Sequence, residues 1–371
     1  MTRGTSQAAV KVASNTTELR TFDLPDLEQH PEGGLLRVEA TGVCGADVMW
    51  YPRVGEPRTE PTILGHHVVG VIEELSDRAA YGLSLAVGDR ILIEEYLPCG
   101  VCVLCREGKY RMCPTTTVWD ENAIRYGSTT VSREPSLWGG FSEYLFLHER
   151  SVAHKLAPST STEQATLILP LSNGIQWIQR DSGVEPGGTV VIVGPGQHGL
   201  TCVVAAQQMG VGNIIVMGLP GDEHRLEIAR TLGAHYTVTD SEEALRIVRD
   251  VTNGRMADAV LDLAAGTPGV ADFALQALGI EGTLLMAVWP DDPTPIPLLK
   301  MAIKKITIKP VRGHSFEAVD AARRLVESGR VDLDILCTGS VGLGDVHQVL
   351  MDLQNPDVRG EMIHMSVDPW R

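Results

Sequence analysis

Residues 189–210 read TVVIVGPGQHGLTCVVAAQQMG, an apolar run followed by spaced glycines and then by a helical pattern. Gly194, Gly196 and Gly199 have the spacing G-x-G-x-x-G. Gly194 permits a tight turn, Gly196 lets the backbone approach a pyrophosphate, and Gly199 lets the helix pack on the sheet. The N-terminus of such a helix favours negative charge. The stretch therefore predicts a strand–turn–helix unit that binds a dinucleotide, with an ordinary glycine turn as the structural alternative.

The segments around this loop alternate between apolar strands and helices. Helices are expected at residues 222–234, where Gly233 is a stop signal, and at residues 240–252. Apolar strands are expected at residues 189–194, 213–218, 234–239, 257–264, 282–289 and 305–311. Nearly all-apolar strands that alternate with helices predict a parallel, doubly wound α/β sheet that is covered on both faces.

The remainder of the chain has a different sequence pattern. Short runs rich in β-branched residues, separated by Gly, Asp and Pro, predict strands at residues 35–43, 68–75, 89–96 and 138–149. Helices are expected at residues 162–180 and 315–329, and a closing strand at residues 360–370. The chain therefore combines a β-rich region with a parallel α/β region.

The end of the second apolar strand bears on the choice of dinucleotide. An Asp or Glu usually stands there and accepts hydrogen bonds from the adenosine ribose hydroxyls. This chain has Gly218 at that position, with Asp222 and Arg225 a few residues further on. Arg225 is either a partner for a 2′-phosphate or a charge on the helix surface. The cofactor is therefore predicted as NAD or NADP, without a choice between them.

Four of the seven cysteines lie within one short segment, CGVCVLCREGKYRMC. Cys99, Cys102, Cys105 and Cys113 have the spacing C-x2-C-x2-C-x7-C. Four thiolates brought together by short loops match the tetrahedral preference of Zn²⁺, and an all-sulfur shell is typical of a structural site. An iron–sulfur cluster or unliganded thiols are the alternatives. The segment predicts a structural zinc site.

Two adjacent histidines, His66 and His67, lie in the apolar run PTILGHHVVG at residues 61–70. Histidine is the commonest side-chain ligand for metals and the commonest group for proton transfer near neutral pH. This pair therefore predicts a second functional centre.

Composition excludes several classes of partner. The 371 residues are 43% hydrophobic, which suits two domains with sizeable cores. A formal net charge of −16 argues against binding to nucleic acids or anionic membranes. No apolar stretch reaches the roughly 18 residues of a membrane span, and the N-terminus does not resemble a secretory signal. We expect a cytoplasmic protein whose partner is a small-molecule substrate.

The motifs GVCGADV, LGHHVVGVI, VGDRI, the four-cysteine segment, WGGFSEY and VGPGQHGL occur in this order. In order and spacing, the chain closely resembles the zinc-containing medium-chain dehydrogenase/reductase superfamily, the alcohol and polyol dehydrogenases. The resemblance implies a GroES-like catalytic domain at residues 1–165 and 311–371, with the zinc lobe at 95–115. It also implies a Rossmann domain at residues 166–310, an active site in the cleft between the domains, and a homodimer or homotetramer.

The resemblance also implies a catalytic zinc held by Cys44, by His66 and by a third Cys or Glu. The third position is Leu169 in this chain, because the family's EPLS segment reads LPLS. Leucine cannot ligate a metal. Two protein ligands plus water are few for tight zinc binding, so the presence of this zinc stays open.

Further departures concern the family's proton-handling groups. Ala46 replaces a hydroxyl residue, Met49 replaces a histidine, and His67 replaces a glutamate. Three roles are open for His67, namely third zinc ligand, acid/base group or hydrogen-bond partner. Neighbouring residues on a strand point to opposite faces, which argues against joint ligation with His66 unless the strand has ended. Asp47 is expected to orient His66 or an arginine.

These features favour an NAD(P)-dependent oxidoreductase that moves hydride between nicotinamide and an alcohol/carbonyl substrate, with or without zinc assistance. Without zinc, reduction of an activated C=C bond is the alternative. A nucleotide-binding or sensing protein that has lost catalysis is the alternative from another class, and the losses at Ala46, Met49 and Leu169 motivate it.

Overall fold

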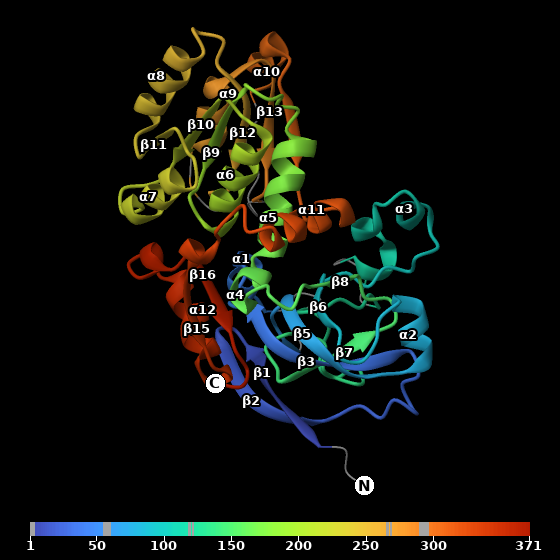
Figure 1. The fold of residues 1–371 in the computed structure, drawn as a ribbon. Coiled ribbons are helices and arrows are strands. Elements are labelled where there is room, and N and C mark those ends of the chain that lie inside the picture. The colour runs from blue at the N-terminus through green and yellow to red at the C-terminus, as the bar shows by residue number, and fades with distance from the viewer. Residues whose placement is uncertain are drawn as a thin grey trace. The chain divides into compact units, whose positions relative to one another are not determined.

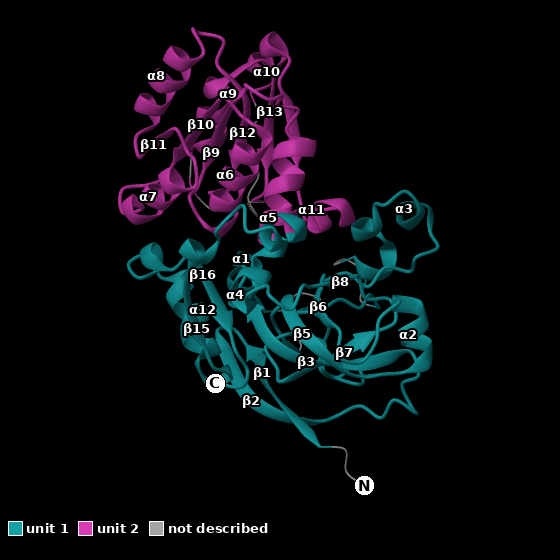
Figure 2. Ribbon diagram, in the orientation of Figure 1, with its two compact units in different colours: residues 1–169, 323–371 teal, residues 170–322 magenta. Residues whose placement is uncertain are grey.

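The computed structural model describes residues 4–54, 61–117, 120, 122–264, 267, 269–288 and 297–371. It divides the chain into two compact units (Figure 2). Unit 1 comprises residues 1–169 and 323–371, and unit 2 comprises residues 170–322. The domain limits expected at residues 165 and 311 stay a prediction. Among the described residues, no helix is long and apolar enough to cross a membrane.

Unit 2 is built on a six-stranded parallel sheet with the strand order β11-β10-β9-β12-β13-β14 (Figure 1). The strands are β9 (Thr189–Val193), β10 (Asn213–Met217), β11 (Tyr236–Val238), β12 (Ala257–Asp262), β13 (Leu278–Met286) and β14 (Thr307–Pro310). All six expected strands are present. The predicted doubly wound α/β class is therefore confirmed.

Helices cover both faces of this sheet, as Figure 1 shows. The helices that pack against its strands are α6 (Gln197–Met209), α7 (Glu223–Thr231), α8 (Ser241–Val251), α9 (Val270–Ala277) and α10 (Leu298–Lys304). The unit also includes parts of α5 (Ile168–Ile175), which starts in unit 1, and of α11 (Phe316–Glu327), which crosses into unit 1. Every residue of β9 is buried, so both faces of this central strand are covered. The Asp240 side chain accepts a hydrogen bond from the Glu243 amide and begins α8. Gly233, with φ of 112°, follows the end of α7.

The continuous helix expected at residues 162–180 is wrong. The structure has α4 (Thr162–Thr166), α5 and then a π-helical turn at Gln176–Asp181. Pro170 explains the first interruption, because it has no N–H to donate to the carbonyl of Thr166 and its ring would clash with that carbonyl. In the first turn of α5 the same proline is tolerated.

Unit 1 is β-rich. One sheet has the order β15-β16-β3-β5-β6-β8, with β7 also paired to β3, and a second sheet has the order β2-β1-β4. The strands are β1 (Thr5–Ala13), β2 (Thr16–Asp23), β3 (Gly33–Gly42), β4 (Thr62–Ile63), β5 (His67–Leu75), β6 (Arg90–Ile93), β7 (Tyr144–His148), β8 (Ala153–Lys155), β15 (Cys337–Val341) and β16 (His364–Val367). The remaining helices are α1 (Gly45–Trp50), α2 (Asp77–Leu83), α3 (Val103–Arg106) and α12 (Val346–Gln354).

The start of β5 sets the position of the two adjacent histidines, His66 and His67. β5 and β6 are antiparallel, and Val68 pairs with Ile93. His67 is the first residue of β5, and on the other side of this strand it pairs with Gly42 of β3. The histidine pair therefore lies at one end of β5.

Candidate metal centres and cofactor loop

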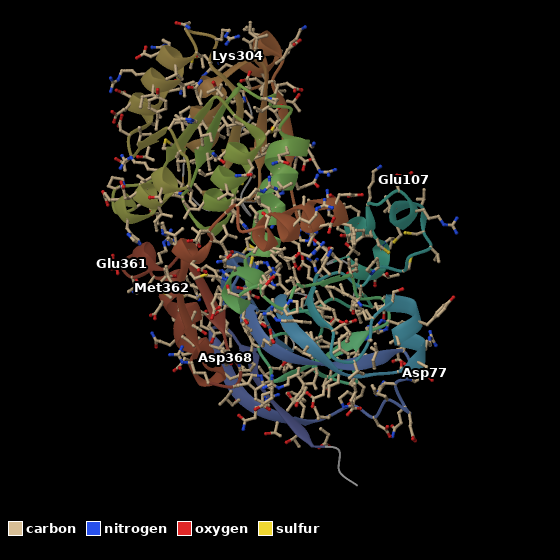
Figure 3. All side chains as sticks on the ribbon, viewed as in Figure 1. Asp77, Glu107, Lys304, Glu361, Met362 and Asp368 are labelled. Carbon is tan, nitrogen blue, oxygen red and sulfur yellow. The ribbon has the colours of Figure 1, made fainter. Side chains whose placement is uncertain are left out.

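The four cysteines of the predicted zinc lobe lie together. Their sulfur atoms are all within 4.8 Å of one another, and all four thiols are free. The Cys102 and Cys105 sulfurs are 3.5 Å apart, and those of Cys102 and Cys113 are 3.9 Å apart. Glu107, which directly follows α3, marks this part of unit 1 in Figure 3. The group forms a closed shell of four sulfur donors that could hold a metal ion.

Backbone amides of the lobe point at these sulfurs. The amide of Cys99 donates to the Cys113 sulfur at 3.3 Å, and the amide of Cys102 donates to the Cys99 sulfur at 3.4 Å. Although burial acts in the opposite direction, hydrogen bonds from Cys99 and Thr115 lower the pKa of Cys113 to about 6. The thiolate is the form that binds metals. The lobe therefore favours a deprotonated sulfur at neutral pH.

A buried hydrogen-bond network ties the lobe to the sheet of unit 1. Tyr110, which lies between the third and fourth cysteines, donates its hydroxyl to the Glu94 carboxylate at 2.8 Å. His154 of β8 contacts the same carboxylate with Nε2 at 2.8 Å. Glu94 is fully buried, and burial raises the pKa of Tyr110. Sequence reasoning missed this network, since its members are far apart in the chain.

The second group consists of Cys44, His66 and His67, whose ligand atoms lie within 4.8 Å of one another. Cys44 is the residue before α1, and all three side chains are buried. The structure therefore brings together the two ligands implied by the resemblance and a third that the resemblance does not supply.

The strand alternation that argued against joint ligation by the two histidines does not apply here, because the strand ends between them. β5 begins at His67, so His66 precedes the strand, and Gly65 turns the chain there with φ of 86°. The two imidazole rings lie edge to face, with their centroids 4.6 Å apart. Both rings can therefore offer a nitrogen to the same ion.

Asp47 in α1 holds this arrangement. One carboxylate oxygen lies 3.3 Å from Nδ1 of His66 and accepts the Gly65 amide at 3.1 Å, and the other accepts the Cys44 amide at 2.9 Å. Although burial acts to lower it, the charge and hydrogen bond of Asp47 raise the pKa of His66 well above its usual value. A carboxylate on Nδ1 leaves Nε2 of that ring for a metal, as in carboxylate–histidine–zinc arrangements.

His67 has the properties of a metal ligand rather than of a charged group. Burial lowers the pKa of its imidazole, so the ring is neutral at neutral pH. Its Nδ1 is buried and has no hydrogen-bond partner among the described residues. Two imidazoles and one thiolate form a mixed N/S donor set, which suits Zn²⁺ and keeps a fourth position open. The residues therefore fit a catalytic zinc.

Three further positions supply no ligand. Leu169, the third ligand position in the resemblance, is buried at 1% exposure near the start of α5. Ala46 and Met49 lie in α1, where neither offers a hydroxyl or an imidazole. The apolar character of Leu169 explains why another donor is required.

The glycine loop lies in unit 2, between β9 and α6. Gly194 has φ of 104°, and a Cβ on Gly199 would lie 2.0 Å from the Gly194 carbonyl oxygen. Gly196 precedes α6, and a Cβ there would meet nothing within 4 Å. Gly194 and Gly199 are therefore required by the fold itself, whereas Gly196 leaves open space before the N-terminus of α6.

The carboxylate of Asp222 lies at the end of β10, although the residue that follows this strand is Gly218. The side chain of Asp222 accepts the Leu219 amide at 2.8 Å, and a Cβ on Gly218 would lie 3.2 Å from the same oxygen. Arg225 approaches Asp222 at 3.8 Å. The sequence analysis named Asp222 but gave it no role, because it lies five positions after β10 and its side chain approaches Gly218 only through a turn.

Comparisons with known proteins agree with this architecture. Residues 30–158 match the family described as alcohol dehydrogenase GroES-like domain, and residues 199–328 match the zinc-binding dehydrogenase family. A probable alcohol dehydrogenase of Mycobacterium tuberculosis is 34% identical over 76% of this chain and 75% of its own length. Sorbitol dehydrogenase of Bacillus subtilis is 34% identical over 75% of this chain and 74% of its own. The crystal structure described as a short chain alcohol dehydrogenase from Escherichia coli CFT073, in complex with NADH, has the same fold, with a TM-score of 0.81 at 19% identity over 98% of this chain and 99% of that chain.

Proposed function

Since the chain belongs to the zinc-containing medium-chain alcohol and polyol dehydrogenase superfamily, and is an oxidoreductase of that kind, we propose that it transfers hydride between NAD(H) and an alcohol/carbonyl substrate with the help of a zinc ion. Cys44, His66 and His67 hold this zinc in the proposal. Zinc bound there would polarise the substrate oxygen as a Lewis acid.

The observation that carries the proposal is the convergence of His67 on Cys44 and His66. Leu169 removes the usual third ligand, and a group with only two ligands would bind zinc weakly. His67 restores a three-ligand set from a neighbouring position. Asp47 positions His66, and burial of the three side chains keeps bulk water away from the ligands.

The proposed preference for NAD over NADP rests on Asp222. Its carboxylate lies at the end of β10, where an acidic side chain accepts the ribose hydroxyls of NAD. A 2′-phosphate would meet this negative charge. Unit 2 is the proposed dinucleotide-binding domain, and the four-cysteine lobe of unit 1 is the proposed structural zinc site. The homodimer or homotetramer stays a prediction.

Metal content and cofactor binding test the proposal together. The wild type should carry two zinc ions per chain, bind NADH more tightly than NADPH, and exchange hydride with alcohols or carbonyls. One zinc with full activity on enones would instead support the zinc-free C=C reductase. Nucleotide binding without hydride exchange on any alcohol, carbonyl or enone would instead support the nucleotide-binding or sensing role.

Gly196→Val is the sharpest test of the loop. A Cβ there would meet nothing within 4 Å, so the variant should fold and keep its melting temperature. Its affinity for NADH should fall by at least about 100-fold, because the valine side chain fills the space that the pyrophosphate needs. Gly199→Val is the contrast, since its Cβ would collide with the Gly194 carbonyl and destabilise the fold. Unchanged NADH affinity in Gly196→Val would contradict the assignment.

A further inference from the structure

One lysine of unit 1 is buried without a carboxylate partner. Lys11 lies in β1 and is 4% exposed. Its Nζ donates to the carbonyl oxygen of Trp50 at 2.8 Å and to that of Arg53 at 2.7 Å. Among the described residues, this ammonium group has no acidic partner. Burial of a charged group is costly even when it is hydrogen-bonded, so stability alone does not favour a lysine here.

The carbonyls that bind this ammonium group belong to the end of α1. Trp50 is the last residue of the helix. The last carbonyls of a helix carry partial negative charge and have no partner within the helix, so a cation suits them. The Ser14 hydroxyl and the Asn15 amide donate to the two carbonyls in between, at 2.8 Å and 3.1 Å. The four consecutive carbonyls of residues 50–53 are therefore all bound by the β1–β2 hairpin.

The main chain of Lys11 reaches the other segment that supplies ligand atoms. In β1, Lys11 pairs with Thr62 of β4. From β4 the chain passes through one turn to His66 and His67. On the other side, α1 begins directly after Cys44. The side chain of Lys11 thus holds the segment of Cys44, and its main chain holds the segment of both histidines.

α1 is therefore tied to the β4–β5 segment at both of its ends. At its start, the Asp47 carboxylate accepts the Gly65 amide and lies beside His66. A short helix that is held only at its start can pivot, and Cys44 would move with it. The contacts of Lys11 at the other end of the helix remove this freedom. Zinc sites require ligand distances within about 0.2 Å of their ideal values, so a small pivot is sufficient to weaken one.

We propose that Lys11 is a positioning residue for the Cys44–His66–His67 group. It fixes the direction of α1 relative to the β4–β5 segment, and thereby the distance of the Cys44 sulfur from the two imidazoles. This inference rests on the proposed function, because it takes the group as the catalytic zinc site. Lys11 acts only through α1, so its removal should change metal binding at this group and leave the four-cysteine lobe as it is.

Lys11→Met tests the inference, because methionine keeps an unbranched apolar side chain and removes the ammonium group. Competition with a chelator at low temperature measures the zinc affinity of both groups in the same molecule. At the Cys44 group we expect the affinity to fall by about 10- to 100-fold, the range for residues that orient metal ligands. The four-cysteine lobe is the internal reference, and its affinity should not change. Unfolding would instead release both zinc ions.

A matched control and a milder variant complete the set. Ser14→Ala removes a hydrogen bond from the same end of α1, but Ser14 follows the end of β1 and its loss should leave both affinities unchanged. Lys11→Gln keeps N–H donors without the charge, and should give a smaller loss at the Cys44 group only.

The visible absorption spectrum of bound Co²⁺ reports the geometry of the site independently of affinity. Co²⁺ is placed in the Cys44 group while Zn²⁺ stays in the lobe. Lys11→Met should change the spectrum, because the ligand atoms are no longer held at the same distances. Ser14→Ala should give the spectrum of the wild type.

The outcomes separate this inference from the proposed function. Wild-type zinc affinity and Co²⁺ spectra in both Lys11 variants overturn the inference and leave the function standing. Equal loss of zinc from both groups also overturns it, since that result marks a residue that only stabilises unit 1. A wild-type protein that binds zinc in the lobe alone overturns the proposed function, and the role of Lys11 with it.

Discussion

The two groups of metal-ligating side chains in unit 1 are built in opposite ways. The four-cysteine lobe takes all its ligands from residues 99–113, with one short helix and turns between them. The Cys44–His66–His67 group takes its ligands from the start of α1, from a turn and from the first residue of β5. A site made by one short segment needs only local turns, whereas the other needs the whole sheet to bring its parts together.

The two groups also differ in the number and type of their ligand atoms. Four sulfurs complete a tetrahedral shell and leave no position for a substrate, so the lobe serves stability. One sulfur and two nitrogens leave a position open, and the three ligands are buried. In the proposed function, ligand number and placement separate a stabilising metal from a catalytic one within the same β-rich unit. The following variants test that separation, in order of their expected effect on turnover.

His66→Ala should have the largest effect. It removes one of three ligands and leaves Asp47 without its imidazole partner, so the second zinc should be lost and kcat/KM should fall about 1,000-fold or more. Metal content by atomic emission and steady-state kinetics measure both changes. His235→Ala, a histidine of unit 2, is the control. Two zinc ions and near wild-type rates in His66→Ala would remove the distinction between the groups.

His67→Ala should lower kcat/KM by about 100-fold through loss of the same zinc. The zinc count decides between two roles. Loss of one zinc marks His67 as a ligand, whereas two zinc ions with a slow rate would mark it as a proton-transfer group and contradict the ligand assignment. Addition of excess Zn²⁺ should restore part of the rate only in the first case.

Asp47→Asn should weaken zinc binding at the Cys44 group by about 10-fold, with a similar fall in rate at limiting zinc. The change keeps the size of the side chain but removes the charge that faces His66. Competition with a chelator measures the affinity of each site. Asp77→Asn, at the exposed first turn of α2, should have no effect. Equal loss of zinc from both sites would show that Asp47 acts on the whole unit.

Cys102→Ser should leave turnover nearly unchanged and act on stability alone. One zinc should be lost, and the melting temperature should fall by about 5–10 °C, because the lobe loses the metal that holds its loops. Calorimetry and kinetics at low temperature measure the two effects separately. Cys337→Ser, a free thiol outside both groups, is the control. A stable variant with two zinc ions would contradict the structural role of the lobe.

Much of the fold could be predicted from the chain alone. The parallel sheet followed from nearly all-apolar strands around the glycine loop, since period and turn signals are local properties. The interruption of the helix expected at residues 162–180 was missed, because hydrophobic periodicity alone makes that pattern continuous, although Pro170 is a local signal for a break. The proximity of the four cysteines also followed from spacing, because a chain of 15 residues with turns keeps its members close.

Sequence was sufficient for the ligand types, the lobe and the class of fold, because each depends on residues that are neighbours in the chain. Tertiary structure alone decided that His67 joins Cys44 and His66, because this depends on where β5 begins and how the chain turns at Gly65. It also decided that the Asp222 carboxylate lies close to Gly218 and that Arg125 forms an ion pair with Glu95. Such contacts depend on strand register and on turns, which are set by the packing of a whole unit rather than by any single motif.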